Sequence, residues 1–388
     1  MITAPFLLAV LLATTTMQHG HGAAPQKGMR TPAVAFESRT KVWRVWTDEG
    51  HILAAVSTDG GKSWPAGTRI TREAETIDAN GESRPKLALG SKGEVYVSWT
   101  RSGKKSHSGD VRFSRSVDGG KTFDAPRTIN DDGVERTHRF DTLAVAADGT
   151  VHLAWVDARD ADAAKAAEKP YIGAALYHAV SRDRGATFAA NRKIKDHICE
   201  CCRIARTFDE DGNLVLLWRD AAGNLRDHVL IRLTPQGKVA GEPARATTDN
   251  WKINGCPHQG PSIAVGRDGV THMVWFTGEG PNGPGAFYGR LDANGKAMGA
   301  PHRLTPLTMS RGVVEVQGSR VIVAWKESRT AGAAVMVSTS SDNGATFSAP
   351  RAVAETSGMS DHPLLVTSAG GVYLSWFAAT EGHRLIAL

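Results

Sequence analysis

A repeated eight-residue pattern, Ser-x-Asp-x-Gly-x-Ser/Thr-aromatic, constrains the fold of this 388-residue chain more than any other feature. In each copy the aspartate can accept hydrogen bonds from its own turn, the glycine permits positive φ, and the aromatic ring can pack against the adjacent sheet. The pattern therefore predicts hairpin turns, in which the aspartates are structural. The four copies lie at residues 57–64, 116–123, 181–188 and 340–347, with the aspartates Asp59, Asp118, Asp183 and Asp342.

A second repeat consists of short alternating segments that end in tryptophan. Their last residues are Trp46, Trp99, Trp155, Trp218, Trp275, Trp325 and Trp376. A short apolar strand and a turn precede each segment, and a third strand, a turn and a fourth strand are expected to follow. In the fourth and fifth units the turns 234–237 and 292–295 lack the aspartate motif. Four antiparallel strands per unit are typical of a propeller blade.

The sequence thus predicts an all-β fold, a β-propeller of four-stranded antiparallel blades. Seven blades are favoured, and six stay open if one terminal unit does not form a blade of its own. The last unit ends after its third strand, so we expect residues 24–29 to complete it.

The N-terminal region predicts export. Residues 6–13 (FLLAVLLA) form an apolar run of the length found in secretory signals. We expect residues 1–24 to be a signal peptide and residues 25–388 to be a single propeller domain, periplasmic or secreted. The sequence contains no second hydrophobic segment, so we expect no transmembrane anchor. The net charge of +6 is dispersed, which argues against a nucleic-acid partner, and we expect a monomer.

Strand order defines two faces of the predicted propeller. The loops before each first strand and after each tryptophan share one face, here called the upper face, and the aspartate turns lie on the opposite, lower face. Arginine recurs at nearly the same register in the upper loops, at Arg30, Arg84, Arg139, Arg203 and Arg311. Guanidinium groups bind carboxylate and sulfate well. We therefore predict that a small anionic ligand or a glycan binds to four of them, Arg84, Arg139, Arg203 and Arg311.

All four cysteines lie in two adjacent upper loops. Cys199, Cys201 and Cys202 precede the fourth unit, and Cys256 precedes the fifth together with His258. Thiolate and imidazole donors of this kind select copper(I) or zinc. In an exported protein, a disulfide from one of the first three cysteines to Cys256 is the alternative. The sequence predicts a copper or zinc site, a disulfide-stapled pocket, or both.

The fourfold motif resembles the Asp-box, or BNR, repeat of the sialidase-like β-propeller superfamily. The resemblance covers essentially the whole mature chain, and the CxCC segment at 199–202 and the WxIxGCP segment at 251–257 resemble a bacterial subgroup of these proteins. The superfamily contains sialidases, other glycosidases, photosystem assembly factors and receptors without catalytic activity. The resemblance therefore implies the fold and leaves the function open.

A sialidase-like activity is the alternative hypothesis. Residues 29–32, Met-Arg-Thr-Pro, resemble the Arg-Ile-Pro motif of sialidases, except that Thr31 replaces isoleucine. The resemblance implies that Arg30 would bind a substrate carboxylate, and Asp48 could be the acid/base of an exo-glycoside hydrolase acting on an anionic glycan. None of the five tyrosines lies in a recognisable nucleophile context. Whether the protein is an enzyme stays open at this point.

Overall fold

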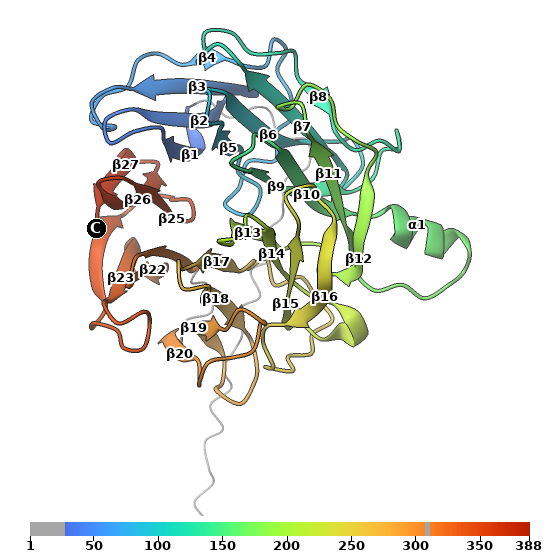
Figure 1. Ribbon diagram of the computed structural model, residues 1–388, viewed down its shortest axis with the longest axis vertical. Coiled ribbons are helices and arrows are strands. Elements are labelled where there is room, and N and C mark those ends of the chain that lie inside the picture. Colours follow the sequence, from blue (N-terminus) through green and yellow to red (C-terminus); the bar gives the residue numbers. More distant parts are fainter. Residues whose placement is uncertain (1–27, 307–310) are drawn as a thin grey trace, which may run out of the picture.

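Seven antiparallel sheets are arranged around a central axis in the computed structural model, which describes residues 28–306 and 311–388 (Figure 1). Six of the sheets have four strands and the last has three. The predicted propeller with seven blades is therefore confirmed. Apart from the helix α1 (Arg159–Ala166) and the 3-10 turn η1 (Ala222–Asn224), the regular elements of the described residues are strands.

Each blade is built from consecutive strands, with the first strand next to the axis. Blades one and two contain β1 (Arg30–Phe36), β2 (Val42–Asp48), β3 (His51–Ser57), β4 (Thr68–Arg69), β5 (Lys86–Leu89), β6 (Val95–Ser102), β7 (Gly109–Ser116) and β8 (Arg127–Thr128). Blades three and four contain β9 (His138–Val145), β10 (Val151–Asp157), β11 (Ala174–Ser181), β12 (Arg192–Ile198), β13 (Ala205–Phe208), β14 (Leu214–Arg219), β15 (His228–Leu233) and β16 (Val239–Arg245). Blades five to seven contain β17 (Ser262–Val265), β18 (Thr271–Thr277), β19 (Gly285–Leu291), β20 (His302–Thr305), β21 (Val313–Gln317), β22 (Arg320–Arg329), β23 (Gly332–Ser340), β24 (Arg351–Thr356), β25 (Leu364–Ser368), β26 (Gly371–Ala378) and β27 (Gly382–Ala387).

The core lies between neighbouring blades. One cluster joins Val45 of blade one to Val97 and Trp99 of blade two, and similar clusters join the later blades. The repeated tryptophans supply the largest buried side chains, and Trp99 and Trp376 are completely buried. Each blade therefore buries its two faces against its neighbours, which is why the repeat needs a closed ring.

The aspartate turns have the geometry that the motif predicts. In the third copy, Asp183 accepts from the Thr187 backbone at 2.8 Å and from the Ser181 hydroxyl at 2.7 Å. In the first copy, the Gly60 amide donates to Thr40 O at 2.7 Å in the turn between β1 and β2. The motif turns therefore lie at the same end of the blade as the first hairpin turn, the lower face.

The ring closes by side-chain packing between blades one and seven. Strand β1 contacts β25 and β26, and the rings of Phe36 and Tyr373 lie 4.8 Å apart. Residues 24–29 were expected to complete blade seven, and residues 24–27 of this segment lie outside the described residues, as does the predicted signal peptide. Gly28 donates its amide to Asp48 Oδ1 in blade one at 2.8 Å. Within residues 28–306 and 311–388, no helix is long and apolar enough to cross a membrane.

Candidate functional site: a cysteine cluster beside a buried carboxylate

The upper end of the central axis is occupied by the loop at residues 78–84, which precedes blade two. Gly81 packs against the His362 ring of blade seven so closely that an added Cβ would come within 2.1 Å of it. The next residue, Glu82, is 4% exposed. This loop therefore reaches from blade two to the far side of the ring.

Glu82 holds groups from several blades together. Its Oε2 accepts from the backbone amides of Arg203 at 3.0 Å and Gly260 at 2.9 Å. Its Oε1 lies 2.8 Å from the Arg203 guanidinium, 3.4 Å from that of Arg311 and 3.6 Å from His362 Nδ1. One buried carboxylate thus neutralises part of the charge of two arginines and fixes the loops before β13 and β17.

Arg84 connects the same region to the closure of the ring. Its guanidinium donates to the backbone oxygens of Pro32 at 3.0 Å and His362 at 2.7 Å, and lies 3.4 Å from Asp361. Burial raises the pKa of Asp361 to about 6, against the opposing effect of Arg84. Lys326 donates to Ser360 O at 2.8 Å.

The predicted anion-binding arginines are therefore already engaged with protein groups. Three of them, Arg84, Arg203 and Arg311, lie together at the centre of the upper face. Arg139 is separate: its Nε donates to Asp78 Oδ2 at 3.0 Å, in an ion pair. Arg30 lies at the start of β1, paired with Thr47 in the sheet next to Asp48. In the described part of the chain, no carboxylate forms an ion pair with Arg30.

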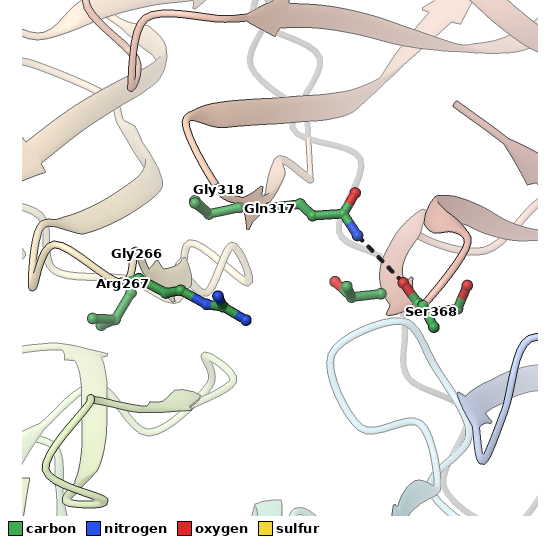
Figure 2. A pocket seen from close by; sticks show the side chains of 9 residues that line it. Gly266, Arg267, Gln317, Gly318 and Ser368 are labelled. Atoms are coloured by element: carbon green, nitrogen blue, oxygen red, sulfur yellow. Dashed lines mark hydrogen bonds between the residues drawn. The ribbon is translucent and has the colours of Figure 1, made fainter.

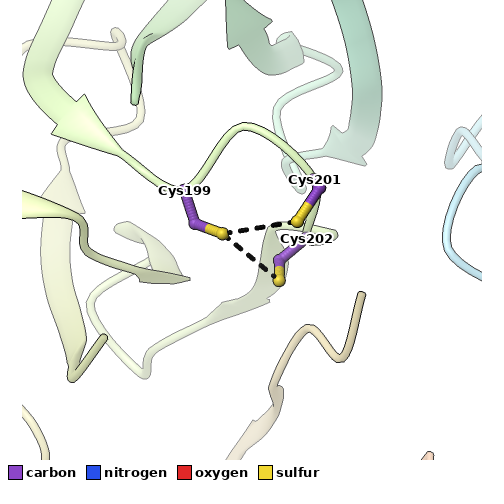
Figure 3. A group of neighbouring side chains, drawn as sticks. All are labelled: Cys199, Cys201 and Cys202. Atoms are coloured by element: carbon purple, nitrogen blue, oxygen red, sulfur yellow. Dashed lines mark hydrogen bonds between the residues drawn. The ribbon is translucent and has the colours of Figure 1, made fainter. Parts of the chain in front are cut away.

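The cysteines converge beside this carboxylate. Cys199 Sγ lies 3.6 Å from the sulfurs of both Cys201 and Cys202 (Figure 3), and these three side chains are 2–4% exposed. Cys201 belongs also to a second group, with Cys256 and His258, whose ligand atoms all lie within 4.8 Å of one another. Cys256 is exposed and His258 is half-buried. The site therefore runs from the surface into the core.

An arginine and a carboxylate lie beside the cluster: Arg219 at its buried end, and Glu200, whose Oε1 accepts from the Cys256 thiol at 3.7 Å. Arg219 is 1% exposed and donates to the carbonyl oxygens of Arg226, Gln259 and Phe276, at 2.7–3.0 Å. Within the described residues it forms no ion pair with a carboxylate. Burial opposes ionisation of Cys202, but hydrogen bonds from Cys199 and Cys201 and the charge of Arg219 hold its pKa well below the usual range. The surroundings therefore favour a thiolate at Cys202, whereas hydrogen bonds with Cys199 and Cys202 raise the pKa of Cys201.

All four cysteines are free in the structure, so the alternative of a disulfide to Cys256 is not confirmed. Other soft donors in the upper loops are not part of the cluster. His362 faces Glu82, His138 lies 3.1 Å from Asp132, and Met359 is 84% exposed. Met309 lies outside the described residues.

Three residues that matter here were not predicted as site residues. Glu82 and Arg219 are ordinary charged loop or strand-end residues in the sequence. His228 begins β15, is completely buried, and has no hydrogen-bond partner on either ring nitrogen among the described residues. Burial lowers its pKa, the charge of Arg219 lowers it further, and Cys202 partly opposes this. Its position before a run of apolar residues, HVLIRL, was the only signal in the sequence.

The cavities lie along the central axis. A cavity of about 620 Å³ opens at its lower end, where Arg267, Gln317 and Ser368 line it and Gln317 Nε2 donates to Ser368 O at 3.3 Å (Figure 2). A smaller one of about 160 Å³ is lined by Arg206 and Glu315. Burial raises the pKa of Glu315 to about 7.

No protein-family model matches this chain, and no curated protein matches it in sequence. Solved structures are similar in fold. An ulvan lyase of polysaccharide lyase family PL25 has a TM-score of 0.61 and 12% identity, covering 94% of this chain and 93% of that one. The polysaccharide lyase Uly1 has a TM-score of 0.55 and 10% identity, covering 96% of this chain and 92% of that one. The Hadza microbial sialidase Hz136 has a TM-score of 0.50 and 16% identity, covering 90% and 73%. At these identities the likeness shows the β-propeller fold alone.

Proposed function

We propose that this propeller binds a soft metal ion, copper(I) or zinc, at the cysteine cluster on its upper face. The observation that carries the proposal is the convergence of four free thiols and one imidazole from two loops, in two groups whose donor atoms lie within 4.8 Å. Thiolate and imidazole are the donors that these ions prefer.

The surroundings of the cluster support a bound cation. Cys199, Cys201 and Cys202 are buried, and burying several thiolates without a counter-ion is costly. Arg219 offsets part of that charge, and a metal ion would offset the rest. If the chain is exported, as its N-terminal run predicts, a bound ion would also protect neighbouring thiols from oxidation to disulfides in that compartment.

The test is metal analysis of the purified mature protein together with a count of free thiols. We expect stoichiometric copper or zinc after growth in supplemented medium, and loss of the metal in Cys201→Ser. Met359→Leu removes an exposed thioether from a neighbouring loop and serves as the matched control, which should retain the metal. Two disulfides and no bound metal would overturn the proposal.

A second candidate, an exo-glycoside hydrolase of sialidase type acting on an anionic glycan, is favoured by Arg30. This arginine is paired in the sheet with Thr47, the residue before Asp48, and forms no ion pair with a carboxylate in the described part of the chain. The fold is shared with the lyases and the sialidase named above. Against it, Arg84, Arg203 and Arg311 are engaged with Glu82, Asp361 and carbonyl oxygens. Hydrolysis of a sialoside that is abolished by Arg30→Ala would support this candidate; turnover retained in that variant would remove its basis.

A further inference from the structure

The five donors form two sets of three that share one sulfur. The inner triplet is Cys199, Cys201 and Cys202, all buried, and the outer triplet is Cys201, Cys256 and His258, which reaches the surface. Each set is compact, with donor atoms within 4.8 Å of one another. The arrangement is thus two triangles with a common corner.

This geometry differs from that of a structural zinc site. A single zinc ion needs four donors arranged tetrahedrally around one point. In the inner triplet, Cys199 Sγ lies 3.6 Å from each of the other two sulfurs. Three sulfurs around one ion, with metal–sulfur bonds of about 2.3 Å, are roughly 4 Å apart. A tetrahedral zinc site needs four donors about 3.8 Å apart, whereas the described donors form two groups of three within 4.8 Å and no group of four. Three-coordination by thiolates is common for copper(I).

We infer that the cluster holds a pair of copper(I) ions, one in each triplet, bridged by the thiolate of Cys201. The inference rests on the proposed metal-binding function and specifies the ion, the stoichiometry and the arrangement. In forming the pair, each thiol releases its proton to solvent and each copper(I) ion exchanges weaker ligands for thiolate or imidazole. No electron is transferred.

Positive charge beside the inner triplet offsets part of the charge of such a pair. Four thiolates and two copper(I) ions together carry two negative charges. Arg219 supplies one positive charge without a carboxylate partner in the described chain. Arg203 and Arg311 share the single carboxylate of Glu82 and leave a second positive charge. Glu200, whose Oε1 lies 3.7 Å from Cys256 Sγ, adds one negative charge at the outer triplet. One divalent ion would give the same balance, so the division of the donors into two groups of three, with no group of four, distinguishes the two.

Native mass spectrometry of the full mature protein, reduced and titrated with copper(I) under anaerobic conditions, tests the inference. We expect two copper ions per chain in the wild type. The double variant Cys256→Ser/His258→Ala removes two outer donors and should hold one ion, and Cys199→Ser/Cys202→Ser should hold one in the outer triplet. Cys201→Ser changes the shared donor and should weaken both. Circular dichroism of each variant confirms that it is folded, and Met359→Leu is the control with two ions.

The possible results are distinguishable. One copper ion in the wild type overturns the pair and leaves the metal-binding function intact. No copper in a folded wild-type protein overturns both. Two ions that persist in either double variant would show that the ions lie elsewhere, and would overturn the assignment of the triplets.

Discussion

At the scale of single residues, Glu82 is the group on which the upper face depends most. It accepts two backbone amides and contacts two guanidinium groups from loops on the far side of the axis. The loops that it fixes carry Cys202 and His258. A carboxylate from blade two therefore positions donors that belong to blades four and five, and we regard it as a positioning residue.

Glu82→Gln should destabilise the protein and weaken copper binding together. Removing one partner of a buried ion pair leaves uncompensated charge, here on Arg203 and Arg311, and typically costs about 3–5 kcal/mol. Urea denaturation measures the first effect, and competition with a copper(I) chelator measures the second. Glu210→Gln, in an exposed turn, is the control. A denaturation midpoint equal to that of the control would show that Glu82 is not essential.

A buried histidine pair predicts how stability depends on pH. His152 Nδ1 lies 3.2 Å from His178 Nε2, and both side chains are 1% exposed. Burial lowers the pKa of His152 to about 4 and that of His178 to about 3. In the unfolded chain histidine has a pKa of about 6.5, so as the pH falls below this value the unfolded state binds more protons than the folded state.

Stability should therefore be constant with respect to these groups above pH 6.5, and should fall as the pH decreases toward 4. By pH 4 the free energy of unfolding should have fallen by about 3 kcal/mol from His152 alone. The melting temperature measured from pH 7.5 to 4 should show this slope, and His152→Phe should flatten it. His302→Gln, at an exposed position, should keep the wild-type slope. An equal slope in both variants would be evidence against this assignment.

At the scale of elements, the aspartate turn is a local device that stabilises one hairpin. Asp183 accepts from two hydroxyls, those of Ser181 and Thr187, and from the Thr187 amide. The first and second turns repeat these contacts through Asp59 and Asp118, and the fourth through Asp342. All four turns lie on the face opposite the cysteines.

Asp183→Asn should lower the melting temperature without changing metal binding. The amide nitrogen cannot accept a hydrogen bond, so at least one of the three is lost, at a cost of about 1 kcal/mol for a solvent-exposed turn. Differential scanning calorimetry and metal stoichiometry measure the two effects. Asp211→Asn, in an exposed turn outside the motif, is the control. A loss of metal in Asp183→Asn would contradict the separation of the two faces.

At the scale of the whole molecule, the fold depends on closing the ring at blades one and seven. Phe36 packs on Tyr373 across this boundary, and Arg44 lies 3.4 Å from His383 Nδ1. Blade seven has three strands in the described chain, so these contacts between β1 and the strands of blade seven hold the ring together there. Arg84 and Asp361 add an ion pair at its upper end.

Tyr373→Ala should weaken closure and destabilise the domain by about 2 kcal/mol, because it removes a half-buried ring from a packed interface. We expect unfolding to stay a single transition, since every blade is packed against two others. Tyr373→Phe keeps the ring and should be close to the wild type. Thermal unfolding followed by circular dichroism tests this, and an unchanged melting temperature in the alanine variant would contradict it.

The sequence alone determined the architecture and the place of the cysteines. Alternating strands that end in tryptophan can bury both faces of a blade only in a closed ring. Turn residues mark where each hairpin reverses. Seven such repeats were therefore enough to favour seven blades. The same strand order put Cys199, Cys201, Cys202 and Cys256 in adjacent loops of one face. These features are local or periodic, and local patterns can be read from the chain.

Only the tertiary structure decided what surrounds those cysteines. Glu82 is separated from Arg203 by 121 residues, and nothing in the sequence predicts that its loop crosses the axis to neutralise the arginines expected to bind a ligand. The division of the donors into two groups of three that share Cys201 depends equally on distances between blades. So does the burial of Arg219 without a carboxylate partner among residues 28–306 and 311–388. Such contacts are set by how the closed ring brings distant loops together at its centre, and no periodicity along the chain encodes them.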